Sequence, residues 1–179
     1  MKHLVPRRYG ADVDDTDLPA GTADAERDNL TAFLDRERDL VLAGLEGLDD
    51  EQARATPTAS TLCALGIVRH LAWVELWWFV HCLRGEPVDF PWTSDDPDAD
   101  FRPDPDDTVV SIADFYRSCC ERARVAVAAV GSLDVVAVHR HGRDCSMRWI
   151  LTHMIEETAQ HAGHLDIIAE SARAPGGRP

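Results

Sequence analysis

Residues 148–172 read RWILTHMIEETAQHAGHLDIIAESA, and this stretch decides how the whole chain is interpreted. Its apolar residues recur at intervals of three and four, which is typical of an amphipathic α-helix. Ile150 and Ile168 lie on the side that faces the core when the helix is wound at about 100° per residue. Four ionisable residues fall on that same inward side: His153, Glu157, His161 and His164. We therefore predict a helix from about residue 145 to 172 with an ionisable stripe on its apolar face.

Three more helices are predicted upstream of this one. Residues 22–48 and 111–130 show the same spacing of apolar residues, with charged residues between them. Residues 62–84 are apolar on almost every side, so we expect this helix to be the most buried. Ser111 and Asp114 fit a capping box at the start of the third helix. Four helices with two long connections predict an all-α fold, a four-helix bundle.

The two long connections differ in composition. Residues 86–108 hold five prolines and eight aspartates, and we interpret them as an acidic, solvated crossover between the second and third helices. Residues 131–144 carry His139 and His141, which we expect at the surface. The predicted domain organisation is an N-terminal arm over 1–21, a bundle over 22–174 and a flexible tail over 175–179.

The charge of the chain narrows the classes of partner. The 179 residues carry a formal net charge of -14. Phosphate backbones and anionic lipid surfaces repel such a chain, so we expect no nucleic acid and no membrane as partners. No apolar run approaches the roughly 20 residues of a membrane-spanning helix. Residues 1–10 lack the apolar core of a secretory signal, and we therefore expect a cytoplasmic protein.

The cysteines indicate reduced thiols. Their number is odd and no C-x-x-C occurs, which argues against both a disulfide framework and a thiolate zinc site. Two adjacent residues of a helix point in different directions, so we interpret Cys119 as a core residue and expect Cys120 to face elsewhere. The five cysteines are Cys63, Cys82, Cys119, Cys120 and Cys145.

A histidine on the second predicted helix also points into an apolar face. His70 lies on the same side of that helix as Ile67 and Val74. Burying an imidazole or a carboxylate among apolar side chains costs free energy unless the group is paired or binds a metal. Glu157 and His161, one turn apart, can present two ligands to one ion while His70 adds the third. From the residues alone, the alternative is a metal-free, hydrogen-bonded His–Glu pair.

Other candidates are weaker. His81 shares the face of His70 but lies about 16 Å further along the axis, so the two cannot bind one ion together. The tryptophans of the second helix are most simply core residues, although some of them could wall an apolar pocket: Trp73, Trp77 and Trp78.

Several motifs together resemble a known superfamily. They are ERxxL at 26–30, GLDxEQA at 47–53, LGxVRHL at 65–71 and RWILxHMIEETAxHAGHLD at 148–166. These motifs are similar to those of the DinB/YfiT-like superfamily, and most closely to its actinobacterial branch of stand-alone members. The resemblance implies a four-helix bundle that holds a divalent metal through three side chains.

The resemblance also implies a ligand set and a chemistry. Many members carry H-x-x-x-H on the fourth helix, whereas Glu157 takes the first of these positions here. The mycothiol-dependent maleylpyruvate isomerases have the same His, Glu, His set, which carries over to His70, Glu157 and His161. The resemblance implies a divalent metal, and two imidazoles with one carboxylate suit zinc first, with nickel or iron as alternatives. The implied co-substrate is mycothiol, whose thiolate the metal favours.

We therefore expect a mycothiol-dependent S-transferase or isomerase that acts on an electrophile. His164 is assigned as the catalytic proton relay, with a role as a fourth metal ligand or as a partner of a ligand left open. The alternative function is a non-catalytic helical bundle that is stabilised by a metal or senses a ligand. Apolar helix faces left over in such bundles often pair, so a homodimer is also expected.

Overall fold

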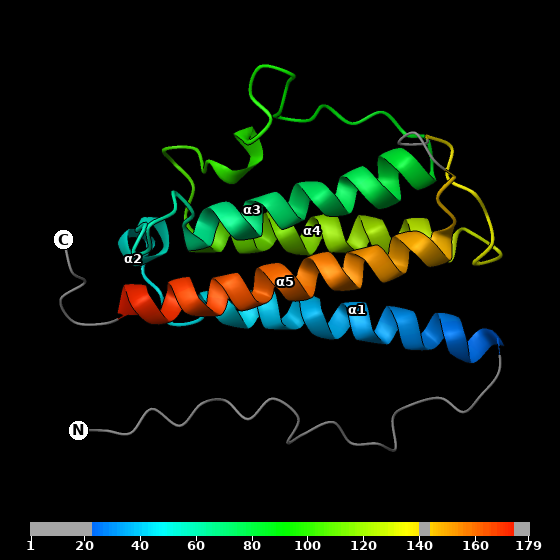
Figure 1. The fold of residues 1–179 in the computed structure, drawn as a ribbon, viewed down its shortest axis with the longest axis horizontal. Helices are drawn as coiled ribbons and strands as arrows, with labels where there is room; N and C mark the ends of the chain where they lie inside the picture. Colours follow the sequence, from blue (N-terminus) through cyan, green and yellow to red (C-terminus); the bar gives the residue numbers. More distant parts are fainter. Residues whose placement is uncertain (1–22, 140–143, 174–179) are drawn as a thin grey trace.

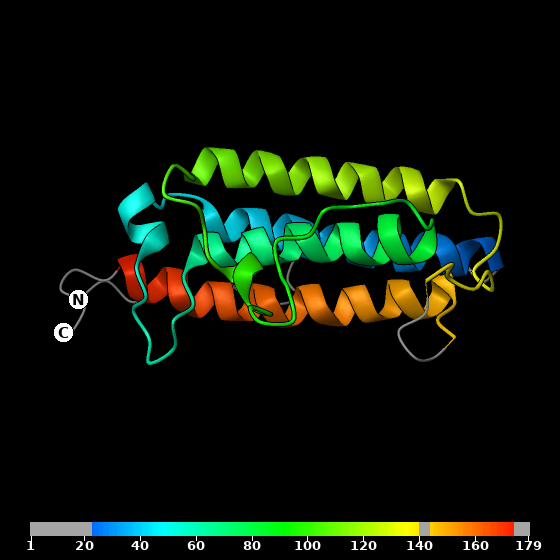
Figure 2. The same cartoon turned by 90° about the horizontal axis from the view of Figure 1, so that it is seen from above.

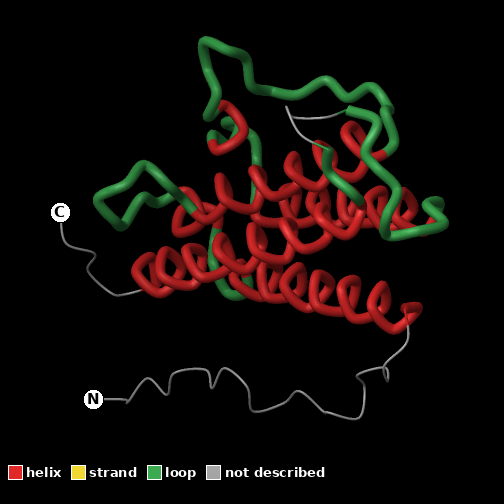
Figure 3. Tube along the Cα trace, turned by 45° about the vertical axis from the view of Figure 1, so that its right-hand side comes forward, coloured by secondary structure: helices red, strands yellow, loops and turns green. Residues whose placement is uncertain are grey.

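The computed structural model describes residues 23–139 and 144–173, and every regular element within these ranges is a helix (Figure 1, Figure 3). The predicted all-α bundle is therefore confirmed. The arm at 1–21, the tail at 175–179 and His141 lie outside the described residues. The long helices are α1 (Ala23–Leu45), α3 (Ala64–Glu75) with its continuation η2 (Leu76–Leu83), α4 (Val109–Ala128) and α5 (Met147–Arg173).

The long helices pack as two parallel pairs, and the two pairs run in opposite directions (Figure 1). α1 lies along α5, and α3 lies along α4, while α5 also contacts α3 (Figure 1, Figure 2). The short helix α2 (Asp50–Arg54) follows α1 and packs against α3 and α5. Apolar side chains from all four long helices fill the space between the pairs. The seam between α3 and α5 is the one that carries the predicted metal ligands.

The second predicted helix is not a single α-helix. It begins at Ala64, where the sulfur of Cys63 accepts a hydrogen bond from the backbone N–H of Gly66, and its last eight residues form the π-helix η2. A π-helix replaces i→i+4 hydrogen bonds with i→i+5 bonds and widens the turn. Because residues 62–84 are apolar on almost every side, their periodicity could not distinguish the two geometries.

The crossover at 86–108 is only partly solvated, which corrects the prediction. Most of its residues are exposed, but it contains the 3₁₀ turn η3 (Ala99–Phe101), in which Asp100 is buried. Arg69 of α3 donates hydrogen bonds to the carbonyls of Ala99 and Asp100, both at 3.0 Å. Figure 2 shows the crossover running over α3. One part of this acidic connection is therefore fixed to the bundle.

The start of the third long helix also differs from the prediction. The N-cap of α4 is Thr108 rather than Ser111, and the two residues form the capping box together. Thr108 Oγ1 accepts from the backbone N–H of Ser111 at 3.1 Å, and Ser111 Oγ accepts from the backbone N–H of Thr108 at 2.8 Å. A capping box is therefore present, but it begins three residues earlier than predicted.

All five cysteines are free and buried, as expected for reduced thiols. The expectation for Cys120 was wrong, because Cys119 and Cys120 are both in the core, at 1% and 3% exposure. Cys120 Sγ lies 3.8 Å from Glu75 Oε1 of α3, so the side of α4 that carries Cys120 is also buried.

Within residues 23–139 and 144–173, no helix is both long enough and apolar enough to cross a membrane.

Candidate metal centre

The three predicted metal ligands meet at the seam between α3 and α5. His70 comes from α3, and Glu157 and His161 lie one turn apart on α5. Glu157 Oε1 is 3.3 Å from His70 Nε2 and 3.2 Å from His161 Nε2. One ligand atom from each residue lies within 4.8 Å of the others. The side chains of His70, Glu157 and His161 are 13%, 23% and 14% exposed, so the group is sheltered but reaches the surface.

Contacts within this group, and with Asp100, shift the pKa values of Glu157 and His70 in opposite directions. The contact with His161, and then the hydrogen bond with His70, hold the pKa of Glu157 well below its ordinary value despite partial burial. Burial alone would lower the pKa of His70, but hydrogen bonds with Asp100 and Glu157 outweigh it and raise that pKa. Glu157 is therefore an ionised carboxylate at neutral pH, and His70 holds a proton readily when no cation is present.

A fourth residue, Asp100, belongs to this site and was not predicted. Its Oδ2 lies 2.7 Å from Nδ1 of His70, and its side chain is only 6% exposed. The neighbouring Phe101 stacks on the His70 ring, with 3.9 Å between ring centroids and 14° between planes. Sequence reasoning missed Asp100 because it lies in an irregular acidic segment, where nothing distinguishes it from seven other aspartates. The only available signal was that long connections are often functional.

The donor set fits a divalent transition metal. With the Nδ1 proton of His70 directed at Asp100, the lone pair of Nε2 faces Glu157 Oε1. Two acceptor atoms at 3.3 Å repel each other unless a proton or a cation lies between them. Two imidazoles and one carboxylate suit zinc and neighbouring divalent ions. Three protein ligands also leave a position for water or substrate, which is the arrangement of catalytic sites.

Comparison with known proteins assigns the chain to a family. The family model described as Mycothiol-S-transferase matches residues 29–174. The chain belongs to the mycothiol-S-transferase family. The match spans all three candidate ligands, Asp100 and most of the bundle, and it confirms the recognition of a DinB/YfiT-like family. No curated protein matches the sequence.

A solved structure with the same fold is also similar. It is the crystal structure of the conserved protein of locus from Enterococcus faecalis, with a TM-score of 0.56 and 14% sequence identity. The alignment covers 81% of this chain and 95% of that chain. At this level of identity the likeness supports the fold alone.

Among the described residues, the other histidines singled out in the sequence are not part of the ligand group. His164 is exposed on α5 rather than inward, and its ring lies edge-on to His161 with 5.5 Å between centroids. His153 is half-buried and packs against both Trp78 and Trp149. His81 lies apart from the ligands, stacked on the exposed His139 at 4.5 Å. The ionisable stripe on α5 therefore divides into two ligand candidates, an aromatic contact and a surface histidine.

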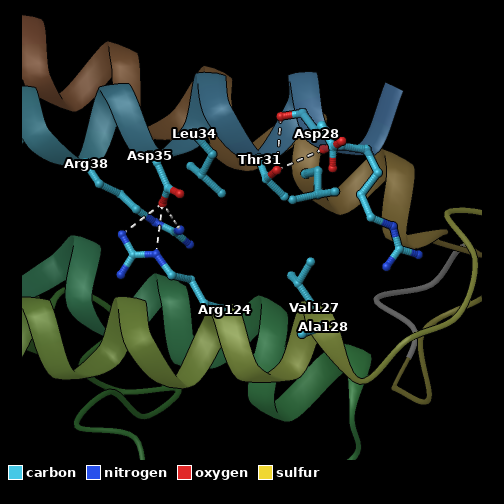
Figure 4. Close-up of a pocket in the computed structure, with 10 residues that line it drawn as sticks. Asp28, Thr31, Leu34, Asp35, Arg38, Arg124, Val127 and Ala128 are labelled. Atoms are coloured by element: carbon cyan, nitrogen blue, oxygen red, sulfur yellow. Dashed lines mark hydrogen bonds and ion pairs between the residues drawn. The ribbon is translucent and has the colours of Figure 1, made fainter. Parts of the chain in front are cut away.

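The bundle also has a cavity between α1 and α4, away from the candidate ligands on α3 and α5. It has a volume of about 210 Å³. Figure 4 shows Asp35 between the guanidinium groups of Arg38 and Arg124 at one end of it. Leu34 and Val127 are among its apolar lining residues. The charged groups at this end are paired with one another, and the cavity is separate from the metal centre.

Proposed function

We propose that this protein transfers mycothiol to an electrophile, using a divalent metal ion held by His70, Glu157 and His161. The family assignment supports the thiol substrate. The observation that carries the metal part is the convergence of three ligand atoms within 4.8 Å. We take zinc as the first choice because two imidazoles and one carboxylate are common zinc ligands. A divalent cation bound here would lower the pKa of a coordinated thiol and favour the nucleophilic thiolate.

The residues of the chain set the conditions for that chemistry. Glu157 stays ionised and offers a negative ligand, while His70 and His161 direct Nε2 towards it. In the proposed reaction the sulfur of mycothiol forms a bond to an electrophilic carbon as a π bond of that carbon opens or its bond to a leaving group breaks. The electron pair of the broken bond moves to the neighbouring atom or to the leaving group, and the thiol proton passes to a base. We propose His164 as that base, because it contacts His161 and is open to solvent, where a proton can be released.

The cellular setting is also part of the proposal. Five free, buried cysteines fit a reducing compartment, and we therefore propose a cytoplasmic location. An isomerase would use the same addition of sulfur, followed by its elimination. We prefer the transferase because the family model that matches the chain describes S-transfer.

The test is a conjugation assay with and without metal. Purified protein is stripped with a chelator, reloaded with zinc and incubated with mycothiol and a panel of electrophiles, and products are detected by mass spectrometry. We expect conjugates only from loaded protein. His70→Ala should lose both metal and activity, whereas His164→Ala should keep metal and lose about 10²–10⁴ in rate. The control is His81→Ala, which changes a histidine outside the ligand group and should keep both.

Two other results would decide against this function. If the wild-type protein binds no divalent ion in chelator-free buffer, the metal-free His–Glu network is correct instead. If it binds zinc and loses much thermal stability on chelation, yet conjugates no electrophile of the panel, the non-catalytic metal-stabilised bundle is supported.

A further inference from the structure

The two histidines of the candidate centre differ in the hydrogen bonding of their Nδ1 atoms. Nδ1 of His70 has a carboxylate acceptor, Asp100 Oδ2, at 2.7 Å. Nδ1 of His161 is buried and has no hydrogen-bond partner among the described residues. A ligating imidazole whose second nitrogen donates to a carboxylate has a fixed tautomer and a more basic ligand atom. Only His70 has this support, and it comes from the crossover rather than from the bundle.

The ring of His70 is also held by packing. Phe101 lies almost parallel to it at 3.9 Å and covers one face, and Asp100 contacts its edge. Rotation of the imidazole about its bond to Cβ would lose both contacts. Two consecutive residues of the 3₁₀ turn thus restrain the direction in which Nε2 points.

The turn itself is fixed to α3 by features of the sequence. Arg69 donates to two of its carbonyl oxygens. A Cβ at position 66 would lie 2.2 Å from the carbonyl oxygen of Phe101, a distance that real Cβ atoms essentially never show. The close approach of the turn therefore requires glycine at position 66.

We propose that the η3 turn is a functional part of the metal centre, with Asp100 as the positioning residue of His70 and Gly66 as the residue that allows the turn to approach. This inference rests on the metal site of the proposed function and adds to it. The Asp100 carboxylate keeps the proton of His70 on Nδ1, so that the lone pair of Nε2 faces Glu157. The long acidic crossover thereby contributes to metal affinity without supplying a ligand.

The first experiment measures zinc affinity by competition with a chromophoric chelator. We expect Asp100→Leu to lower the affinity about 10–100-fold, the usual effect of losing such a partner. Asp100→Asn should lose less, because the amide keeps an acceptor oxygen without its charge. The matched control is Asp98→Asn, which removes the same charge from an exposed residue of the same segment. It should bind zinc as the wild type does.

A second readout separates positioning from general stability. In cobalt-loaded protein the visible absorption bands report the geometry and ligand field of the ion. Asp100→Leu should change these bands. The thermal unfolding midpoint of the metal-free variant should stay close to that of the metal-free wild type, although the zinc affinity falls. A fall of the midpoint in all forms, with unchanged cobalt bands, would show a structural role only and overturn the proposal.

The second pair of variants tests the approach of the turn. Gly66→Ala should weaken zinc binding about as much as Asp100→Asn, although it changes no polar group. The control is Gly163→Ala, since a Cβ at this helical position meets nothing within 4 Å. If Gly66→Ala does not fold, the Asp100 series decides alone.

Failure of this proposal can be told apart from failure of the proposed function. If the wild type binds no zinc, both are overturned. If the wild type binds zinc and Asp100→Leu binds it within about twofold, the crossover plays no part in the centre, while the metal-dependent transferase stands.

Discussion

Glu157 gives the candidate centre its particular charge. With a divalent ion, two neutral imidazoles and one carboxylate leave a net charge of about +1, whereas three histidines would leave about +2. A less positive site is a weaker Lewis acid and holds a bound thiolate less tightly. The residue at position 157 therefore sets the balance between activating the thiol and releasing it.

We predict that Glu157→Gln keeps the fold and weakens zinc binding by at least about 100-fold. The amide is neutral and a poor ligand. The decrease in zinc affinity should therefore be no smaller than the decrease caused by removing a residue that only hydrogen-bonds to a ligand. Glu157→His should restore binding, because the new imidazole again lies one turn before His161. Zinc competition titrations measure both. The ligand assignment is wrong if Glu157→Gln binds normally and His164→Ala does not.

Zinc binding is predicted to weaken as the pH falls from 8 towards 6. A metal needs the lone pair of His70 Nε2, and hydrogen bonds to Asp100 and Glu157 raise the pKa of His70 above its ordinary value near 6.5. Below that raised pKa, one competing proton reduces the apparent affinity up to about tenfold per pH unit. Glu157 does not compete in this range, because its pKa is lowered. Titrations at several pH values check this, and a flat affinity from pH 6 to 8 contradicts it.

Sequence reasoning at this scale succeeded where helical spacing applies. The interval from Glu157 to His161 and the apolar face around His70 were sufficient to predict three residues that the structure brings together. Asp100 could not be found in the same way, because no period connects an irregular segment with a helix 30 residues earlier. The exposure of His164 was missed because a helical wheel shows only the side of the helix on which a residue lies. It does not show whether a neighbouring helix covers that side.

At the scale of the elements, the four long helices were predictable and their ends were not. Apolar spacing identifies a helix over many residues, but a cap depends on one or two side chains. Thr108, Ser111 and Asp114 all offer an oxygen near the start of α4, and only the backbone conformation shows that Thr108 is the N-cap. The short helix α2 and the π-helix η2 are too short or too uniformly apolar to show a period.

We predict that Thr108→Ala destabilises the protein by about 1 kcal/mol, the usual cost of losing an N-cap oxygen. The backbone N–H of Ser111 loses its acceptor at the end of the crossover. The thermal midpoint should fall by about 2–4 °C for a chain of this size. The control is Ser118→Ala on the same helix, whose exposed hydroxyl donates a hydrogen bond to the carbonyl of Phe115 within its own helix. Equal midpoints for the two variants would contradict the role of the cap.

At the scale of the whole molecule, the candidate metal centre and the cavity lie in two different interfaces between helices. The α3–α5 seam carries the candidate ligands and is approached by the crossover, whereas the α1–α4 seam carries the cavity and its paired charges. All three candidate ligands come from one chain, so the candidate metal centre does not require a second copy. The homodimer stays a prediction, and light scattering of the purified protein would test it.

The two pairs of helices are joined inside the core by an ion pair. Arg38 of α1 donates two hydrogen bonds to Glu75 of α3, both at 2.7 Å, and the two residues are 4% and 0% exposed. A carboxylate and a guanidinium this deeply buried are costly to separate, because the remaining charge cannot reach water. The pair therefore joins α1 to α3 at a buried point of the core.

We predict that Glu75→Gln destabilises the metal-free protein by about 3–5 kcal/mol, because Arg38 then keeps a buried charge without its main partner. Replacing both residues, as Arg38→Met with Glu75→Leu, should recover most of this loss, since apolar side chains of similar volume need no partner. Urea unfolding of the single and double variants measures the difference. If the double variant is as unstable as the sum of its two single changes, the charges do not act as a pair, and burial of each group by itself explains their place in the core.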